Sequence, residues 1–361
     1  MNIENSVLIA GGYGVVGQQI AEAIRANHPE LPILIAGRNP EKGQAIADAL
    51  KNASIVALDM EQRNPLKNLK PHAVVAAVND PNDYLLLDAV QKGIPYLDIT
   101  RWTERLRKSV AIAKNEELKA PVMFSSAWMA GVAAVVTKEL TKETQSIKKI
   151  DISVLYSLKD KAGPNSTEYM DRLATPFEVM INGESKQVYP YTDPQKVTFP
   201  SGYSAKAYRF DTPDQFTLPQ TTKATTVSAR IAFDDATSTY LLVMLTRSGI
   251  WKLFSGERFK SLRQSILFNP GKGANHEIVI QAQGIDITGK PINLRATVLA
   301  PKGQTHLTAV GAAIQLDRLL GLDGALAPSP SIIFPDTAPQ TSHALKVLRS
   351  AGIEVKLESS L

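Results

Sequence analysis

The chain has no cysteine among its 361 residues. Disulfides, thiolate nucleophiles and cysteine-bound metals are therefore excluded. Histidine is scarce as well, because the five histidines are spread along the chain with neither an i, i+4 pair nor an H-E-x-x-H sequence. A histidine metal site is not expected either, so we predict that no metal is bound.

Long apolar runs and runs of a single charge sign are also lacking. The longest dense apolar stretch, Tyr240–Leu245, is too short to cross a bilayer. The densest basic run, Arg101–Lys108, is interrupted by Glu104, and the net charge is only +5. We therefore expect neither a membrane span nor a nucleic-acid partner. No basic segment precedes the first apolar stretch, so no signal peptide is expected and a cytoplasmic location is the default expectation.

The composition that remains, 44% apolar and 21% charged residues, is that of an ordinary globular protein. A chain of this length can form two domains. We predict an α/β fold in which a doubly wound parallel sheet occupies residues 1–145 and is completed by residues 304–361. A second α+β domain with a mixed or antiparallel sheet is predicted over residues 146–303.

Residues 1–145 alternate short apolar runs with amphipathic segments, a pattern typical of βαβ units. The predicted strands are Ser6–Ala10, Pro32–Ala36, Ser54–Leu58, Ala73–Ala77, Tyr96–Ile99 and Val122–Ser125. The predicted helices are Val16–Ala26, Pro40–Lys51, Tyr84–Lys92, Glu104–Asn115 and Val132–Leu140. Gly93 is placed to cap the third of these helices.

In the middle of the chain, strand patterns with turn signals replace this alternation. Asn182-Gly183 between two apolar runs predicts a hairpin within Phe177–Val188. Further predicted strands are Thr225–Phe233, Thr239–Leu245, Glu277–Gln283 and Pro291–Leu299. Short helices are predicted at Thr167–Leu173 and Glu257–Leu267, and a long irregular excursion at Tyr189–Pro219.

The C-terminal part returns to helical spacing. A helix is predicted at Thr305–Leu320, followed by Gly321 as its stop. Residues Ser342–Leu357 have the pattern of a helix, then Gly352, then a strand. This βα-like character predicts that the end of the chain returns to the first domain.

The most informative motif is the strand-turn-helix segment Val7–Gln18, which places Gly12, Gly14 and Gly17 in G-x-G-x-x-G spacing. The first glycine permits a tight turn, the second lets backbone amides approach a pyrophosphate, and the third lets the helix pack closely on the strand. The anion then lies at the helix N-terminus. The residues of this turn that we expect to bind a dinucleotide are Gly12, Tyr13, Gly14, Val15, Val16 and Gly17.

The end of the second predicted strand indicates which dinucleotide is bound. An NAD site usually has Asp or Glu about 20 residues beyond the glycines, where it accepts hydrogen bonds from the ribose hydroxyls. Here the sequence is Ala36-Gly-Arg-Asn39. Because a guanidinium fork suits a 2′-phosphate, Arg38 and Asn39 predict NADP. The alternative, which leaves NAD possible, is that Arg38 only decorates the start of the second helix.

The later strand ends supply further candidates, since ligands of open α/β sheets lie at the carboxyl ends of the strands. Asp59 and Met60 should lie near the adenine, although Asp59 can instead cap its own turn. Val78, Asn79 and Asp80 should lie near the middle of the cofactor. Asp98, Thr100, Arg101 and Trp102 follow the fifth strand, closer to the expected nicotinamide.

The pattern resembles the saccharopine dehydrogenase-like family of NADP-dependent oxidoreductases. The resemblance rests on Gly11–Gly17, Ala36–Asn39, the strand end Tyr96–Thr100, and Ile278–Leu299 followed by the helix from Thr305. It implies a Rossmann domain completed by C-terminal residues, a second domain that commonly supports a homodimer, and a cleft between the two for a small-molecule substrate. Relatives often have an Asp-Pro-Gly-like turn after the sixth strand, whereas this chain reads Ser125-Ser-Ala-Trp-Met-Ala-Gly131, so the resemblance does not assign the substrate.

A reductase of this kind transfers a hydride between nicotinamide and a C=N or C=O bond, or a C=C bond, so orientation of the substrate matters more than a strong acid. As catalytic candidates we take Asp98, Arg101 and Tyr169, with Tyr156 and Lys159 as other groups able to donate a proton. Arg172 is a candidate ligand for a substrate carboxylate, and Trp128 with Met129 a candidate apolar wall.

Two other classes compete with this interpretation. A short-chain dehydrogenase needs Lys four residues after its catalytic Tyr, and none of the ten tyrosines has one. A non-catalytic NADP-binding sensor or interaction protein stays open, because no residue spacing forces a catalytic constellation.

Overall fold

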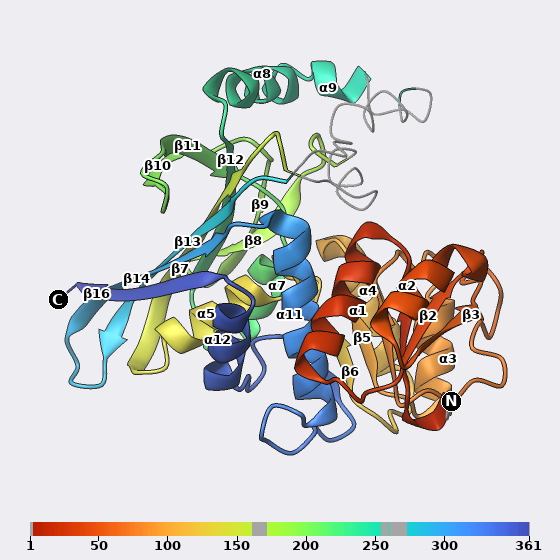
Figure 1. The fold of residues 1–361 in the computed structure, drawn as a ribbon. Helices are drawn as coiled ribbons and strands as arrows, with labels where there is room; N and C mark the ends of the chain where they lie inside the picture. The colour runs from red at the N-terminus through yellow and green to blue at the C-terminus, as the bar shows by residue number, and fades with distance from the viewer. Residues whose placement is uncertain (1–2, 161–171, 254–258, 260–272, 361) are drawn as a thin grey trace. The chain divides into compact units, whose positions relative to one another are not determined.

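The computed structural model describes residues 3–160, 172–253, 259 and 273–360, and the chain separates into two compact units (Figure 1). The first unit comprises residues 1–132 and 308–347. The second comprises residues 133–307 and 348–361. Each unit has its own seven-stranded sheet.

The sheet of the first unit is parallel throughout, with the strand order β15-β6-β5-β4-β1-β2-β3. Its strands are β1 (Val7–Ala10), β2 (Ile33–Gly37), β3 (Ala53–Ala57), β4 (Ala73–Ala76), β5 (Tyr96–Asp98), β6 (Val122–Phe124) and β15 (Ile332–Ile333). Around it lie η1 (Ile3–Asn5), α1 (Val15–Asn27), η2 (Pro40–Gly43), α2 (Gln44–Leu50), α3 (Tyr84–Lys92) and α4 (Thr103–Lys114). The order 6-5-4-1-2-3 is the doubly wound arrangement expected from the sequence, so that prediction is confirmed.

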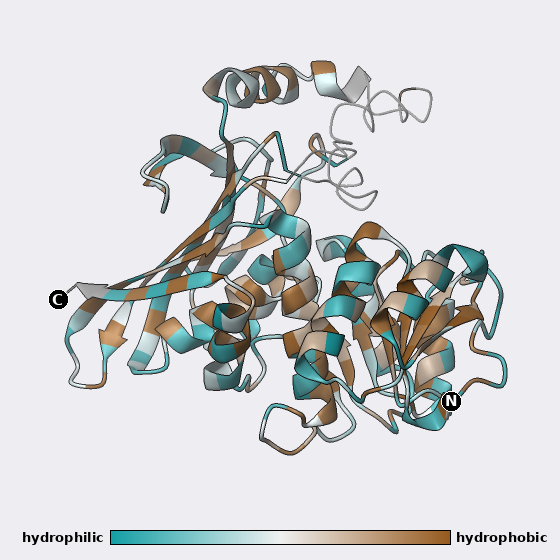
Figure 2. Ribbon diagram, viewed as in Figure 1, coloured by the Kyte–Doolittle hydropathy of each residue, from teal (hydrophilic) through white to brown (hydrophobic). Residues whose placement is uncertain are grey.

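Burial on both faces explains why these strands read as continuous apolar runs. All four residues of β1 are buried. Ile9 and Ile35 pack in one core cluster with Ile20 of α1 and Leu316 of α11 (Gly303–Leu320). Alternate residues of each strand point to the opposite face. Figure 2 shows the same layering, with brown strands enclosed by helices that are partly hydrophilic.

Helix α11 and α12 (Thr341–Ser350) are tied to α1 through one buried carboxylate. Asp317 Oδ1 forms a hydrogen bond with His28 Nε2 at 2.6 Å, and Asp317 Oδ2 forms one with His343 Nε2 at 2.8 Å. C-terminal residues thus contribute to the core of the first unit, and β15 pairs with β6 at its edge.

The second unit is built on a mixed sheet with the order β10-β11-β12-β7-β13-β14-β16. Its strands are β7 (Thr144–Tyr156), β10 (Gln195–Thr198), β11 (Ser204–Arg209), β12 (Thr226–Phe233), β13 (His276–Asp286), β14 (Pro291–Ala300) and β16 (Glu354–Ser360). The pair β12–β7 is parallel and the other pairs are antiparallel. The prediction of a second, mixed or antiparallel sheet is confirmed. The long central strand β7 was not singled out from the sequence.

The remaining elements are a separate hairpin and several helices. They are β8 (Phe177–Ile181), β9 (Glu184–Val188), α5 (Val132–Leu140), α7 (Asp214–Thr222), α8 (Ala236–Arg247) and α9 (Ile250–Leu253). The predicted two-residue turn joins β8 to β9, with positive φ at both Asn182 and Gly183. The predicted cap Gly93 is confirmed as well, because it is left-handed at the end of α3.

The strand predicted at Thr239–Leu245 is wrong, since these residues lie in helix α8. The helix begins at a cap in which the Asp235 side chain accepts a hydrogen bond from Ser238 N at 2.7 Å. The periodicity of a dense apolar run does not by itself distinguish a strand from a helix. Here the Asp235 cap favours the helix.

The irregular excursion predicted at Tyr189–Pro219 is also wrong. It contains the antiparallel pair β10–β11 and the start of α7. Val197, Phe199 and Ala207 pack with Leu155 and Val279, so the excursion acquires its structure from distant strands.

Residues 308–347 belong to the first unit, but the final strand does not return to it as predicted. Strand β16 pairs antiparallel with β14 and forms the edge of the second sheet. The alternating apolar residues Val355 and Leu357 of β16 are compatible with either sheet. Which sheet the strand joins is determined only by its pairing with the distant strand β14.

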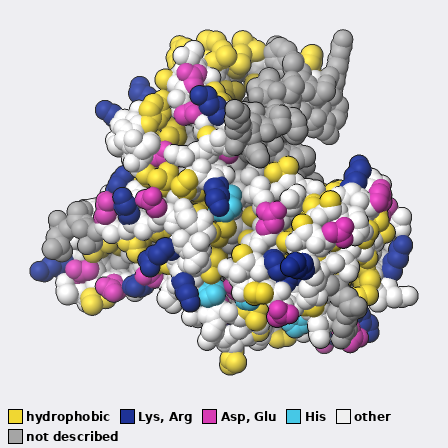
Figure 3. All heavy atoms as spheres, in the orientation of Figure 1, with side chains coloured by type: hydrophobic (Ala, Val, Ile, Leu, Met, Phe, Trp, Pro, Cys, Tyr) yellow, Lys and Arg dark blue, Asp and Glu magenta, His cyan; other side chains and the backbone are white. Residues whose placement is uncertain are grey.

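The predicted short helix at Glu257–Leu267 and most of that at Thr167–Leu173 lie outside the described residues. Within the described part of the chain, no helix combines the length and hydropathy needed to span a membrane. On the face displayed in Figure 3, basic side chains are interspersed with acidic ones.

Candidate cofactor site

The glycine turn joins β1 to α1 and is shaped by contacts that exclude side chains. Gly11 has φ +78°, a left-handed conformation that favours glycine. A Cβ on Gly12 would lie 2.9 Å from the Ile9 carbonyl oxygen, and one on Gly17 would overlap the Gly11 carbonyl oxygen. The helix can therefore begin directly on the turn only because these positions are glycine. Gly11 was not assigned a separate role from the sequence, although its place beside Gly12 was a signal.

The first turn of α1 faces outward from this loop. Gly14 is its N-cap residue, and within the described part of the chain no side chain caps the helix. Gly14 and Val15 are exposed, and the Val15 side chain is 49% accessible. Val78, which is 39% accessible, lies against Gly11 on the other side of the turn. Backbone N–H groups at a helix N-terminus, flanked by two exposed valines, form a cradle suited to an anion with an apolar neighbour.

The end of β2 lies next to this cradle because of Tyr13. A Cβ on Gly37 would overlap the Tyr13 ring, so the ring lies directly on Gly37. The Tyr13 hydroxyl accepts a hydrogen bond from Asn39 N at 3.2 Å. Arg38, between these two residues, projects outward with 69% of its side chain accessible. The structure thus brings the glycine turn and Arg38 together, as the sequence predicted.

The residues after β3 are engaged with their own turn. Asp59 Oδ1 accepts a hydrogen bond from Glu61 N at 3.1 Å, and Asp59 Oδ2 accepts one from Gln62 Nε2 at 3.0 Å. Met60 is buried. Asp59 therefore caps its own turn, which was the alternative to a contact with the adenine. Glu61, which was not singled out from the sequence, lies with its carboxylate 3.6 Å from Arg38 Nη1.

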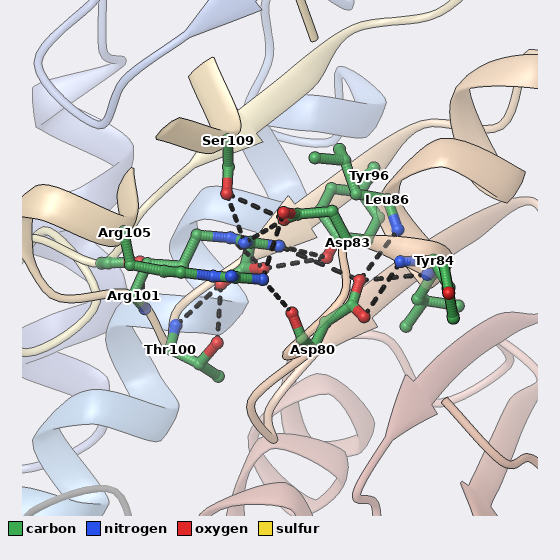
Figure 4. Close-up of polar contacts among 12 residues, drawn as sticks. Asp80, Asp83, Tyr84, Leu86, Tyr96, Thr100, Arg101, Arg105 and Ser109 are labelled. Carbon is green, nitrogen blue, oxygen red and sulfur yellow. Dashed lines mark hydrogen bonds and ion pairs between the residues drawn. The ribbon is translucent and has the colours of Figure 1, made fainter. Parts of the chain in front are cut away.

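The loops after β4 and β5 are joined by a buried charge network (Figure 4). At its centre, Arg101 is fully buried, and its Nε donates to Asp98 Oδ2 at 2.8 Å. Arg101 Nη1 is paired with Asp83, which also receives Arg105 Nη2 at 3.1 Å. Tyr96 donates its hydroxyl to Asp98 Oδ2 at 2.8 Å. A buried guanidinium is tolerated here because carboxylates surround it.

Asp80 connects this network to helix α3. Its carboxylate accepts hydrogen bonds from the backbone N–H groups of Tyr84, Leu85 and Leu86 at 3.0–3.1 Å, and lies 4.0 Å from Arg101 Nη2. Burial raises the pKa of the Asp80 carboxyl to about 6, although the Leu86 N–H and Arg101 oppose the shift. Burial also raises the pKa of Tyr96 far above its ordinary value. For Arg101, burial lowers the pKa, but the charges of the neighbouring carboxylates, Asp98 first and Asp83 after it, outweigh it and the net shift is upward.

The sequence candidates Asp98, Thr100 and Arg101 all belong to this network. Asp98 Oδ1 accepts hydrogen bonds from Thr100 N at 2.8 Å and Thr100 Oγ1 at 2.9 Å. Arg101 N donates to Ser126 Oγ at 2.9 Å, which links the loop after β5 to the segment after β6. These side chains fix the ends of three neighbouring strands.

The segment after β6 is a left-handed turn. Met129, Ala130 and Gly131 all have positive φ, of 54°, 50° and 84°. The Ala130 carbonyl oxygen accepts a hydrogen bond from Ser125 Oγ at 2.9 Å. Trp128 and Met129 are partly exposed here, and Thr308 Oγ1 lies 3.2 Å from Met129 Sδ.

The candidates in the second unit are held by local partners. Arg172 Nη2 lies 3.9 Å from Asp211 Oδ2. The Tyr156 hydroxyl accepts a hydrogen bond from Gln304 Nε2 at 2.8 Å, and burial raises the pKa of Tyr156 to about 12. Tyr169 lies outside the described residues. Among the described residues, no group of three His, Asp or Glu side chains is arranged to hold a metal ion.

Comparison with protein families gives a match over this part of the chain. Residues 7–135 match the model of the saccharopine dehydrogenase NADP binding domain. The first unit carries a saccharopine dehydrogenase NADP-binding domain. This confirms the resemblance stated from the sequence, NADP as the cofactor, and, at the level of this domain, an enzyme of the NADP-dependent oxidoreductase type.

Several solved structures are similar to this chain at low sequence identity, and the first named here shares its fold. Saccharopine dehydrogenase (L-Glu forming) from Saccharomyces cerevisiae is 13% identical, with a TM-score of 0.68 over 99% of this chain and 100% of that one. A myo-inositol dehydrogenase from Corynebacterium glutamicum is 14% identical, with a TM-score of 0.42 over 97% of this chain and 95% of that one. A levoglucosan dehydrogenase solved with NADH and L-sorbose is 10% identical, with a TM-score of 0.43 over 98% of each chain. No curated protein sequence matches this chain.

The contact between Tyr13 and Gly37 in the NADP-binding domain is testable by a double-mutant cycle. We expect Gly37→Ala to destabilise the protein by about 1–3 kcal/mol, because the new methyl group displaces the Tyr13 ring. In a Tyr13→Ala background the same change should cost much less, since the overlapping ring is gone. Urea unfolding of the four proteins measures the coupling. Equal costs in both backgrounds would show that the ring does not lie on Gly37.

The raised pKa of Asp80 predicts a pH-dependent stability term. Its pKa is about 6 in the folded protein and about 3.9 in an unfolded chain, so its contribution is fully present below about pH 4 and is lost as the pH rises through 6. The unfolding free energy of the wild type minus that of Asp80→Asn should therefore decrease between pH 4.5 and 7 and then level off. Asp48→Asn, at an exposed position, serves as the control. Parallel pH profiles for the wild type and Asp80→Asn contradict the assignment.

Proposed function

We propose that the chain is an NADP-dependent oxidoreductase that transfers a hydride between nicotinamide and a C=N or C=O bond of a small substrate. A C=C bond is a further candidate acceptor. The observation that carries the proposal is Arg38, exposed at the end of β2 and adjacent to the glycine turn through the contact of Tyr13 with Gly37.

The residues at the edge of the first sheet fit the parts of NADP. Backbone N–H groups of residues 15–17, at the start of α1, suit the pyrophosphate, and the flanking Val15 and Val78 suit apolar contact with neighbouring uncharged parts of the cofactor. Arg38, with the turn that Tyr13 and Asn39 hold, suits the 2′-phosphate. When bound, the reduced cofactor supplies a hydride to an electrophilic carbon.

We assign Asp98 and Arg101 as positioning residues for this site. Both are fully buried. Arg101 is paired with Asp98 and with Asp83, so the charges of these side chains are neutralised within the network. Such a network suits the task of holding the loops after β4 and β5, which include Asn79 and Thr100. Trp128, partly exposed on the left-handed turn after β6, suits an apolar part of the substrate. Tyr169 stays a candidate proton donor. Arg172 stays a candidate carboxylate ligand that must share its charge with Asp211.

The reaction is tested with the full chain, NADPH and a panel of imines, ketones and enoyl compounds. Loss of reduced-nicotinamide absorbance with an imine or ketone supports the proposal and names the acceptor. Tight NADPH binding with no turnover across the panel favours the alternative, a cofactor sensor or interaction protein. A substrate that is turned over then allows Trp128→Ala to be compared with the wild type.

The role of Arg38 predicts a change in cofactor preference. Arg38→Ala should weaken NADP binding by roughly 10- to 100-fold, since a charge-assisted hydrogen bond contributes about 1.5–3 kcal/mol. NAD, which lacks the 2′-phosphate, should bind as before. Titration calorimetry with both nucleotides measures the split. Arg63→Ala removes another exposed guanidinium and is the matched control. An unchanged NADP preference in Arg38→Ala eliminates the assignment.

A further inference from the structure

Glu61 is held beside Arg38 by the loop that follows β3. Leu58 N donates a hydrogen bond to the Gly37 carbonyl oxygen at 3.0 Å, which fixes the start of this loop against the end of β2. Asp59 Oδ1 then accepts a hydrogen bond from Glu61 N at 3.1 Å. The backbone of Glu61 is thus placed by two contacts that do not involve its own side chain.

The Glu61 carboxylate and the Arg38 guanidinium form an exposed pair. Glu61 Oε1 lies 3.6 Å from Arg38 Nη1, and 69% of each side chain is accessible. A pair with this exposure contributes little to folding stability and is readily screened by salt. It nevertheless places a negative charge against the guanidinium that a 2′-phosphate would use.

We propose that Glu61 lowers the affinity of the Arg38 subsite for a 2′-phosphate and so sets the preference of the site between NADP and NAD. The inference rests on the proposed function, because it assumes that the glycine turn and Arg38 bind NADP. Because the Glu61 carboxylate lies 3.6 Å from Arg38 Nη1, a phosphate bound by Arg38 would repel it and compete with it for one guanidinium. A carboxylate at this place can also accept hydrogen bonds from the ribose hydroxyls of NAD. Glu61 thereby opposes NADP and favours NAD.

The test is the binding of NADP and NAD to the full-length wild type and Glu61→Gln. For an exposed pair we expect Glu61→Gln to bind NADP roughly three- to tenfold more tightly, with NAD unchanged or somewhat weaker. The gain should shrink between low and high salt because the interaction is screened. Titration calorimetry with each nucleotide measures both affinities without any turnover.

Glu117→Gln is the matched control, since it removes one exposed carboxylate from the same unit at a distant loop. It separates a local effect from a change in net charge. NADP affinity that is unchanged or weaker in Glu61→Gln overturns the role of Glu61. If the wild type still prefers NADP and Arg38→Ala loses that preference, the proposed function stands without it. A wild type that binds neither nucleotide overturns both.

Discussion

The close approach of helix α1 to the turn that precedes it is the constraint on which the candidate site depends. Gly17 carries no side chain because a Cβ there would overlap the Gly11 carbonyl oxygen. The helix can therefore start at Val15, directly after the turn, with no side-chain cap on its first N–H groups. Gly37, at the end of the neighbouring strand β2, also allows a close approach, because its missing side chain leaves room for the Tyr13 ring. Two close approaches thus bring a helix start without a side-chain cap and an exposed guanidinium to one edge of the sheet.

The Arg101 network holds together the loops after β4 and β5 at this edge of the sheet. Arg101 and Arg105 face Asp80, Asp83 and Asp98, so the cluster carries one more carboxylate than guanidinium. Burial raises the pKa of Asp80, which lets this excess charge be relieved by a proton as the pH falls. Buried ion pairs are weak evidence for stability, since desolvation offsets much of their attraction. Their value here is geometric, because they join the loop after β4, which carries Asp80 and Asp83, to the end of β5 and the segment that follows it, which carry Asp98, Arg101 and Arg105.

The sequence was sufficient for much of this architecture. The parallel strands and helices of the first unit follow from local apolar periodicity, and the glycine turn and Arg38 follow from motif spacing. The helix α8, the pair β10–β11 and the final strand β16 could not be predicted in the same way. The first depended on the Asp235 cap, and the other two on pairing with strands that lie far away in the chain. In the site, spacing identified Asp98 and Arg101 but did not show that they are buried. It also did not show that Arg101 is bonded to Asp83 and Ser109, which come from other elements. The proximity of Tyr13 to Gly37, and of Glu61 to Arg38, likewise appears only in three dimensions.

Amide hydrogen exchange of the full chain with NADPH and with NADH measures whether the glycine turn and Arg38 bind the nucleotide. In the proposed function, the glycine turn and Arg38 form two parts of one site, and only Arg38 distinguishes the nucleotides. Both nucleotides should therefore protect residues 11–18, whereas NADPH alone should add protection at residues 38–41. Absence of protection at the glycine turn, or equal protection of residues 38–41 by both nucleotides, would contradict the assignment.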